Sequence, residues 1–355
     1  MPEELRGRLT EARHGVIGRL RERAVAEELE TVLVAGDTFD TETPSRATIR
    51  HALQEMALAP GIRWVIIPGN HDSLQAEELW RIVAGECPEN VTVAREAETL
   101  ALGSDAVLLP APCPVRRPGR DLTDWMSTAE TNPGVIRIGL AHGAIQHFGE
   151  DGAADVIAPD RAARANLDYL ALGDWHGQIR VNERTWYSGT PEPDRFKHDA
   201  PGRALIVEID GPAAVPKVTP IPTGQFLWRD LALDLVGDED PMERLKHSVE
   251  ALENRRNILV SLAAVGRVGL EAKAALNGAT EDIRPDFALM TYDDSRLAID
   301  HNPDDLDAID KAGALRKAAD ALLSEARAEA APEETRRVAE RALSRLYSLS
   351  LEYDA

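Results

Sequence analysis

The chain has 355 residues, of which 43% are hydrophobic, and it carries a formal net charge of −21 with two cysteines. No run of about 18 apolar residues is present, so the sequence predicts no membrane span, and residues 1–6 lack the apolar segment of a secretory signal. The acidic balance argues against a generally basic nucleic-acid surface, and Cys87 and Cys113, which lack metal-site spacing, favour a reducing cytoplasm.

Residues 2–29 predict a helix, because apolar side chains recur there at an approximate helical spacing between Glu and Arg residues. The apolar stripe consists of Leu5, Leu9, Val16, Leu20 and Val25. Three glycines in the same segment weaken the prediction, since glycine is disfavoured inside a helix.

Four later segments share one pattern, in which an apolar strand is followed directly by side chains of the kinds that bind metal ions. They are residues 31–40, 64–72, 136–143 and 169–177. A single such segment is equally typical of a capped turn, because Asn and Asp are ordinary turn residues. Four of them together predict that polar side chains gather at the carboxyl ends of strands, where α/β proteins bind their ligands.

Two loops carry candidate substrate contacts. The first is rich in proline and contains Arg116, Arg117 and Arg120, which are candidates for contacts with a DNA backbone. An ordinary solvated loop is the alternative for this segment. The second loop contains the candidates Tyr187 and Arg195. Its aromatic side chains either stack on bases or pack beneath the loop.

The composition shifts near Gln225. Residues 225–305 alternate predicted strands and helices, with strands expected near residues 257–263 and 287–292, and residues 306–355 predict helices interrupted at Pro332. An apolar strip at helical spacing in the last helix consists of Leu343, Leu346, Tyr347 and Leu351. Such a strip suits packing within the chain as well as contact with a partner protein.

The strand-end motifs together resemble those of the calcineurin-like metallophosphoesterase superfamily. They are Gly-Asp-x-x-Asp at residues 36–40, Gly-Asn-His-Asp at residues 69–72, the isolated His142 and Gly-x-x-His at residues 173–176. Within that superfamily the chain resembles the SbcD-type DNA-repair exonucleases, and the resemblance covers residues 31–196.

The resemblance implies an α/β fold with three parts. A catalytic domain in residues 1–224 is expected to form a four-layer α-β-β-α sandwich that lacks its first strand. A smaller α+β cap domain is expected in residues 225–305, and C-terminal helices are expected in residues 306–355.

The resemblance also implies a centre with two divalent metal ions, for which Mn is expected and Fe, Mg and Zn are alternatives. The expected ligands are Asp37, Asn70, His142, Asp174 and His176. His71 is expected to contact the phosphate and to protonate the leaving oxygen, with Asp40 beside it to orient the imidazole. An N-cap for the following helix is the alternative interpretation of Asp40.

Two features depart from the family pattern. The family's Asp-x-His motif, at the end of an N-terminal strand, is absent, so only one of the two metal sites has its full ligand set. Asp174 stands where the family carries a histidine, although its oxygen still suits a divalent ion. We expect a start codon assigned too late, because loss of a central strand would leave backbone groups unpaired and an edge exposed. A natural variant without that strand is the alternative.

The sequence therefore predicts a metal-dependent phosphodiesterase. The expected activity is that of an SbcD-type DNA exonuclease or endonuclease in DNA repair. The protein is expected to work in the cytoplasm with an SbcC-type ATPase, and a homodimer is expected from the resemblance. The net charge of −21 favours an alternative, a phosphodiesterase or phosphatase of small substrates. The missing motif and Asp174 favour another alternative, a non-catalytic scaffold subunit that binds the ATPase.

Overall fold

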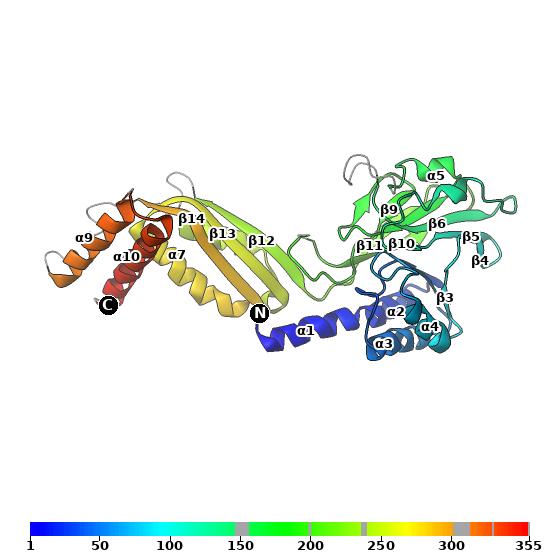
Figure 1. Cartoon of the computed structure of the whole chain (residues 1–355), viewed down its shortest axis with the longest axis horizontal. Helices are drawn as coiled ribbons and strands as arrows, with labels where there is room; N and C mark the ends of the chain where they lie inside the picture. Colours follow the sequence, from blue (N-terminus) through cyan, green and yellow to red (C-terminus); the bar gives the residue numbers. More distant parts are fainter. Residues whose placement is uncertain (146–155, 198–199, 236–239, 301–312, 329, 354–355) are drawn as a thin grey trace. The chain divides into compact units, whose positions relative to one another are not determined.

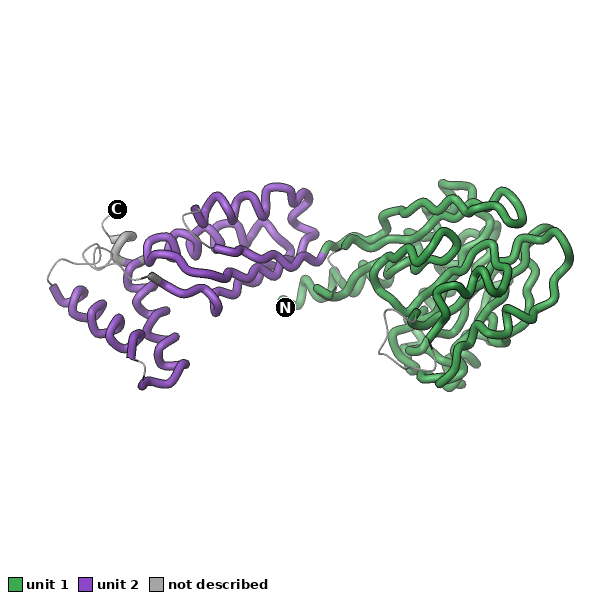
Figure 2. Tube along the Cα trace, turned by 90° about the horizontal axis from the view of Figure 1, so that it is seen from above, with its two compact units in different colours: residues 1–227 green, residues 228–355 purple. Residues whose placement is uncertain are grey.

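The structure, a computed structural model, describes the chain except for residues 146–155, 198–199, 236–239, 301–312, 329 and 354–355. It divides into two compact units, residues 1–227 and residues 228–355 (Figure 2). The first unit ends close to residue 224, where the sequence analysis ends the catalytic domain. The predicted boundary between residues 305 and 306 lies outside the described residues.

The expected N-terminal helix is two helices, α1 (Glu3–His14) and α2 (Val16–Ala26). Gly15 separates them, and its N–H donates to the carbonyl of Glu11 at the end of α1. Only part of the predicted apolar stripe is buried, because Leu5 lies in the core whereas Val25 is exposed.

A three-stranded parallel sheet follows, in the order β1-β2-β3. Its strands are β1 (Thr31–Ala35), β2 (Arg63–Ile67) and β3 (Val91–Val93), and the connecting helices are α3 (Arg46–Ala57) and α4 (Glu77–Glu86). Ser45 caps α3 by accepting a hydrogen bond from the N–H of Thr48. The N-cap interpretation of Asp40 is therefore wrong.

A second, six-stranded sheet has the order β4-β5-β6-β7-β9-β8. Its strands are β4 (Leu100–Leu102), β5 (Ala106–Ala111), β6 (Ile136–His142), β7 (Tyr169–Gly173), β8 (Ile179–Arg180) and β9 (Thr185–Tyr187). The short helices η1 (Asp124–Ser127) and α5 (Arg161–Arg164) lie beside it, and β10 (Arg203–Glu208) pairs with β11 (Lys217–Pro222) in a separate antiparallel sheet.

The two larger sheets pack face to face between helices, which confirms the predicted α/β fold and its α-β-β-α order (Figure 1). On β2, Trp64 and Ile66 share a core with α2, α3 and α4, whereas Val65 and Ile67 pack against the six-stranded sheet. This alternation follows from the two-residue period of a strand that is buried on both faces. The outer face of the six-stranded sheet packs against η1 and α5.

The second unit has an α+β composition around the sheet β12-β13-β14. Its elements are β12 (Leu227–Leu235), α6 (Pro241–Glu250), η2 (Arg255–Asn257), β13 (Ile258–Gly269), α7 (Leu270–Ile283), η3 (Arg284–Asp286), β14 (Leu289–Asp300), α9 (Ala314–Arg327) and α10 (Glu333–Tyr353). Among the described helices, none is long and apolar enough to cross a membrane.

The apolar strip on α10 packs within the second unit. Leu343 and Tyr347 are buried in one cluster with Leu270 and Ala319, and Leu346 packs against it. The side chain of Leu351 lies outside the described ones. For the three described residues, the structure thus supports packing within the chain over contact with a partner.

Asp72 joins the two loops that follow β1 and β2. Its carboxylate is fully buried and accepts hydrogen bonds from the N–H groups of Gly69 (2.6 Å) and Phe39 (3.1 Å), and its carbonyl accepts one from the indole of Trp80. Burial raises the pKa of Asp72 to about 6, although both backbone hydrogen bonds act to lower it. Asp72 is therefore a structural residue that positions its neighbours.

The Asp72→Asn variant should be less stable than the wild type by about 1–3 kcal/mol, the usual effect of leaving a buried polar group unsatisfied. The amide offers one acceptor where the carboxylate offers two, and it directs an NH2 group at a backbone N–H. Urea unfolding of the full chain measures the difference. Asp210→Asn, at an exposed position, serves as the matched control, and equal stability of the two variants would contradict the prediction.

Candidate metal centre

The predicted ligands follow the carboxyl ends of strands from both sheets. Asp37 follows β1, Asn70 follows β2, His142 ends β6 and Asp174 follows β7. Asp37 and Asp174 have positive φ angles of 51° and 96°. Such backbone conformations are strained for residues other than glycine and are concentrated at functional sites.

His142 lies where the two sheets meet. It is buried, and its Nδ1 lies 2.7 Å from the carbonyl oxygen of Ala35 at the end of β1. Because a carbonyl only accepts hydrogen bonds, Nδ1 carries a proton and Nε2 is directed at the carboxylates. Nε2 lies 3.4 Å from Asp37 Oδ2 and 3.7 Å from Asp174 Oδ1. Metal-binding histidines commonly have this arrangement, with the second nitrogen held by a carbonyl.

Asn70 and Asp37 complete the cluster. The Asn70 side-chain Nδ2 donates to Asp174 Oδ1 at 3.1 Å, and the N–H of His71 donates to Asp37 Oδ1 at 2.9 Å. Asn70 Oδ1 and His142 Nε2 are both buried, and neither has a hydrogen-bond partner within the described residues. These two buried atoms have no hydrogen-bond partner, lie beside two carboxylates and can each bind a metal ion. A divalent ion requires ligand atoms of this kind.

The charges within the cluster are coupled. Burial by itself raises the pKa of Asp37, but the adjacent His142 outweighs it, so this pKa is below its usual value. Burial likewise lowers the pKa of His142, and the carboxylate of Asp37 outweighs it, so this pKa is raised. The two side chains thus stabilise each other's charged forms.

The carboxylate, amide and imidazole groups of the cluster are suitable ligands for a divalent metal ion, although the side chains do not surround a single position. In the part of the chain that the structure describes, no group of three or more His, Cys, Asp or Glu side chains is arranged to hold an ion. The fit therefore rests on the orphaned atoms of Asn70 and His142 and on the two carboxylates beside them.

Glycines allow the strand ends to approach this closely. A Cβ at Gly173 would lie 1.8 Å from the carbonyl oxygen of Ala35, and a Cβ at Gly69 would lie 2.2 Å from Asp37 Oδ1. Neither contact is sterically possible, and in the first case the obstacle is backbone. The glycine before each ligand loop is therefore required by the packing of the site.

His71 and Asp40 lie together, but the contact differs from the expected one. Nδ1 of His71 lies 3.2 Å from the backbone carbonyl of Asp40. The carboxylate of Asp40 instead pairs with Arg13 from the end of α1. The carbonyl, and not the side chain, thus holds the imidazole of His71.

A cavity of about 270 Å³ lies on one side of the cluster. Its walls include Asp37, His142 and Asp174, together with His71, His176, Asp40, Arg13 and Arg195. Burial and the positive charge of Arg195 lower the pKa of His176. The structure thus brings His176 and Arg195 to the same cavity as the expected ligands.

A second cavity, of about 590 Å³, shares His142 and Asp174 with the first. Asn70, His142 and Asp174 contribute to its walls, as do Arg116 and Arg117. Arg120 is exposed and does not line either cavity. The expected substrate contact of Tyr187 is corrected by the structure, because Tyr187 is 1% exposed and its hydroxyl donates to the carbonyl of Gly143 at 2.7 Å.

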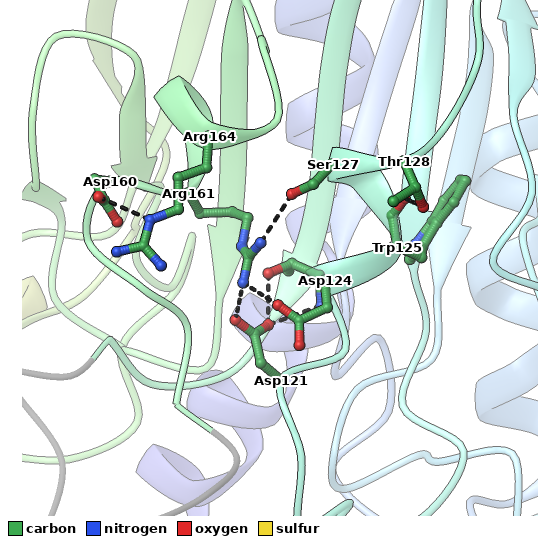
Figure 3. Close-up of polar contacts among 9 residues, drawn as sticks. Asp121, Asp124, Trp125, Ser127, Thr128, Asp160, Arg161 and Arg164 are labelled. Atoms are coloured by element: carbon green, nitrogen blue, oxygen red, sulfur yellow. Dashed lines mark hydrogen bonds and ion pairs between the residues drawn. The ribbon is translucent and has the colours of Figure 1, made fainter.

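The arginine-bearing loop is anchored at its end by Arg161, which is 5% exposed (Figure 3). The guanidinium donates to Asp121 Oδ2 at 2.6 Å and to Ser127 Oγ at 3.1 Å, and it also pairs with Asp124. Asp121 in turn accepts hydrogen bonds from the N–H and hydroxyl of Thr123. These contacts fix the chain directly after Arg120.

Two residues of the site were not predicted from the sequence. Arg13 reaches the first cavity from α1 and lies 3.8 Å from Asp194 Oδ2, as well as pairing with Asp40. Neither Arg13 nor Asp194 belongs to a strand-end motif. No signal in the sequence distinguishes Arg13 from the other arginines of the N-terminal helices.

Residues 12–178 match the model of the family described as calcineurin-like phosphoesterase. The match supports this superfamily for the residues it covers and, with it, a metal-dependent phosphoesterase. The family generally binds two divalent metal ions. No curated protein sequence matches the chain. One similar solved crystal structure has a TM-score of 0.33 and 12% identity over 58% of this chain and 92% of its own, a likeness too low to carry an argument.

Added Mn²⁺ should raise the thermal unfolding midpoint of the full chain, because a ligand that binds only the folded state stabilises it. At about 100 times the dissociation constant, the gain is about 2.7 kcal/mol. His142→Ala should abolish this gain in stability, since it removes the buried imidazole nitrogen that is expected to bind the ion. Differential scanning calorimetry with and without Mn²⁺ measures the effect.

The matched control is His51→Ala, on α3 and outside both cavities, which should keep the gain. A midpoint that Mn²⁺ leaves unchanged in the wild type, or a gain that survives in His142→Ala, would show that these residues do not bind the ion.

Proposed function

We propose, from the calcineurin-like phosphoesterase match and the geometry of the site, that this protein is a metal-dependent phosphodiesterase of SbcD type that cleaves DNA. One observation carries the choice of a diester. His142 and Asp174 line two cavities at once, and each cavity also has arginines in its walls. A phosphodiester has a substituent on either side of its phosphorus, so it would extend from the cluster into both cavities.

Asp37, Asn70, His142 and Asp174 would hold one divalent ion, and Asp37 with His176 would contribute to a second. When bound, such ions stabilise the charge that develops on the phosphate and lower the pKa of attacking water. Mn is the ion proposed, because the resemblance implies it and because carboxylate and amide carbonyl oxygens suit it.

His71 would move the proton to the leaving oxygen. Its Nδ1–H is held by the carbonyl of Asp40, so a second proton on the imidazolium resides at Nε2. His71 lines the smaller cavity, and a proton donated from Nε2 would neutralise the leaving alkoxide.

Arg116 and Arg117 would bind the DNA phosphates that flank the scissile one. Guanidinium groups suit this role because they bind phosphate oxygens through two parallel hydrogen bonds. Arg195 would act similarly in the smaller cavity, although Asp194 already pairs with it at 2.7 Å. An SbcC-type ATPase partner and a homodimer are proposals that rest on the sequence resemblance alone, and a cytoplasmic location is a proposal that rests on the two cysteines.

A second candidate, a phosphodiesterase of small substrates, is favoured by the net charge of −21. Such a charge repels DNA at long range, whereas a small diester needs only the local arginines.

Replacement of both Arg116 and Arg117 by Ala should reduce DNA cleavage with Mn²⁺, as kcat/KM, by about 10- to 100-fold, since a hydrogen bond to a charged group contributes about 1.5–3 kcal/mol. Cleavage of bis(p-nitrophenyl) phosphate should be largely retained, because this diester has no flanking phosphates. A labelled linear duplex and the chromogenic diester provide the two assays.

Arg81→Ala, on the exposed surface of α4, is the matched control and should cleave both substrates normally. Hydrolysis of the nitrophenyl diester by a wild-type protein that leaves DNA intact would favour the small-substrate enzyme. Failure to cleave either substrate, while Mn²⁺ still binds, would favour the scaffold.

A further inference from the structure

Glu192 is a buried carboxylate that joins the loop after β9 to the segment before β12. The residue is 6% exposed. Its Oε2 accepts a hydrogen bond from the N–H of Gln225 at 2.7 Å, and its Oε1 accepts one from the N–H of Phe226 at 3.0 Å. A buried carboxylate has a high free-energy cost unless it is paired and hydrogen-bonded. Glu192 finds its partners in a segment that is distant in the sequence, so it holds the two segments together.

Arg19 on α2 supplies the opposite charge. Its guanidinium donates to Glu192 Oε2 at 2.5 Å, to the carbonyl of Thr223 at 2.8 Å and to the carbonyl of Ala12 at 3.0 Å. The side chains of Arg19 and Glu192 are largely shielded from water. Removal of one member of a buried ion pair has a large effect, because it leaves the other charge uncompensated. The pair therefore fixes the loop after β9 relative to α1 and α2.

Further contacts hold the same loop against the segment before β12. Thr223 Oγ1 donates to the carbonyl of Pro191 at 2.8 Å, and the N–H groups of Thr223 and Gly224 donate to the carbonyl of Gly202. A Cβ at Gly202 would lie 2.2 Å from the carbonyl oxygen of Pro191, which is sterically impossible. Because the backbones touch directly, the loop is held as closely as Glu192 requires.

The loop, residues 188–195, brings Arg195 to the smaller cavity. The walls of this cavity include Thr190, Glu192, Asp194 and Arg195. The N–H of Thr190 donates to the carbonyl of His176 at 2.8 Å, which ties the start of the loop to an expected metal ligand. Arg195 pairs with Asp194, but both residues are on the loop, so this ion pair moves with it. The position of Arg195 in the cavity therefore depends on the contacts of Glu192.

We propose that Glu192 is a positioning residue for substrate binding, which fixes the loop that presents Arg195 to a phosphate of the bound substrate. This inference rests on the proposed function, in which Arg195 binds phosphate in the smaller cavity. Arg19 compensates the charge of Glu192, so the carboxylate in the cavity wall does not repel that phosphate. The arrangement favours a substrate with a second phosphate near the scissile one, which DNA has and a simple diester lacks.

The test is Glu192→Gln in the full chain, since this change removes the charge and keeps the size of the side chain. The variant should raise KM for a labelled linear duplex with Mn²⁺ by about 10-fold, the order of one hydrogen bond to a charged group. The fall in kcat should be smaller, because Glu192 does not touch the reacting atoms. Thr223→Val removes only the hydrogen bond to Pro191 and should raise KM less. This second variant tests the same contact if Glu192→Gln does not fold.

The matched control is Glu55→Gln. Glu55 pairs with Arg21, also on α2, at the same distance of 2.5 Å, and neither residue lines either cavity of the metal centre. The control should keep the wild-type KM. A rise in KM as large as that of Glu192→Gln would show a general effect of losing an ion pair of α2, and would overturn the proposal.

Combination with Arg195→Ala separates positioning from a merely structural role. In the double variant, Glu192→Gln should raise KM by less than it does alone, because both changes act on one contact with substrate. Independent effects that multiply would overturn the proposal.

Amide hydrogen exchange separates the positioning role from the proposed function. Exchange in residues 188–195 should be faster in Glu192→Gln than in Glu55→Gln, with or without substrate. Equal exchange in the two variants would overturn the proposal even if the enzyme cleaves DNA. Faster exchange in a protein that cleaves no DNA would contradict the proposed function and, with it, the role in substrate binding, but not the contact by which Glu192 holds the loop.

Discussion

The contact between His142 and the carbonyl of Ala35 is the constraint on which the site depends. It joins the carboxyl end of β6 to that of β1 at 2.7 Å, and so it links the two sheets. The sheets approach this closely only because Gly173, beside His142 in the ladder, has no Cβ to meet the same carbonyl. Asp37 lies two residues beyond the end of β1, and Asp174 directly follows β7, the neighbour of β6 in its sheet. The positions of both carboxylates are therefore consequences of sheet packing, not of the loops that carry them.

The site is locally unfavourable and is stabilised by its surroundings. It contains buried polar atoms without hydrogen bonds and two aspartates with positive φ, each of which has a free-energy cost. Two residues near the site, by contrast, each make several hydrogen bonds. Asp72 binds the two ligand loops together, and Arg161 fixes the end of the arginine-bearing loop. Strained backbone and unsatisfied buried polar groups that the surrounding contacts hold in place are typical of functional sites.

Most of the strands and helices of the first unit, and the meeting of the strand-end side chains in one cluster, could be predicted from the sequence. Apolar runs that end in Gly-Asp or Gly-Asn are local signals, and the carboxyl ends of parallel strands meet by geometry alone. β14 shows the limit of such signals. It was expected to end near Tyr292, where two aspartates interrupt the apolar run, yet its pairing with β13 extends it to Asp300 across a register shift. Tertiary pairing overrides the local pattern there.

The contacts of Asp40 and Arg13 could not be predicted, because they join elements that are far apart in the sequence. The motif placed Asp40 near His71, but nothing local indicates that α1 would bring a guanidinium to its carboxylate. Likewise, the pattern of β1 indicates a strand buried on both faces, and only the structure shows that, among the described residues, one of its edges has no pairing strand. Sequence periodicity reports which face of a strand is buried, and it carries no information about its edges.

The polar groups around the cluster differ in how they are satisfied. At the ends of β2 and β6, the buried atoms Asn70 Oδ1 and His142 Nε2 have no hydrogen-bond partner within the described residues. In the smaller cavity, Arg13 neutralises Asp40 and approaches Asp194, so the acidic groups there already have a cationic partner.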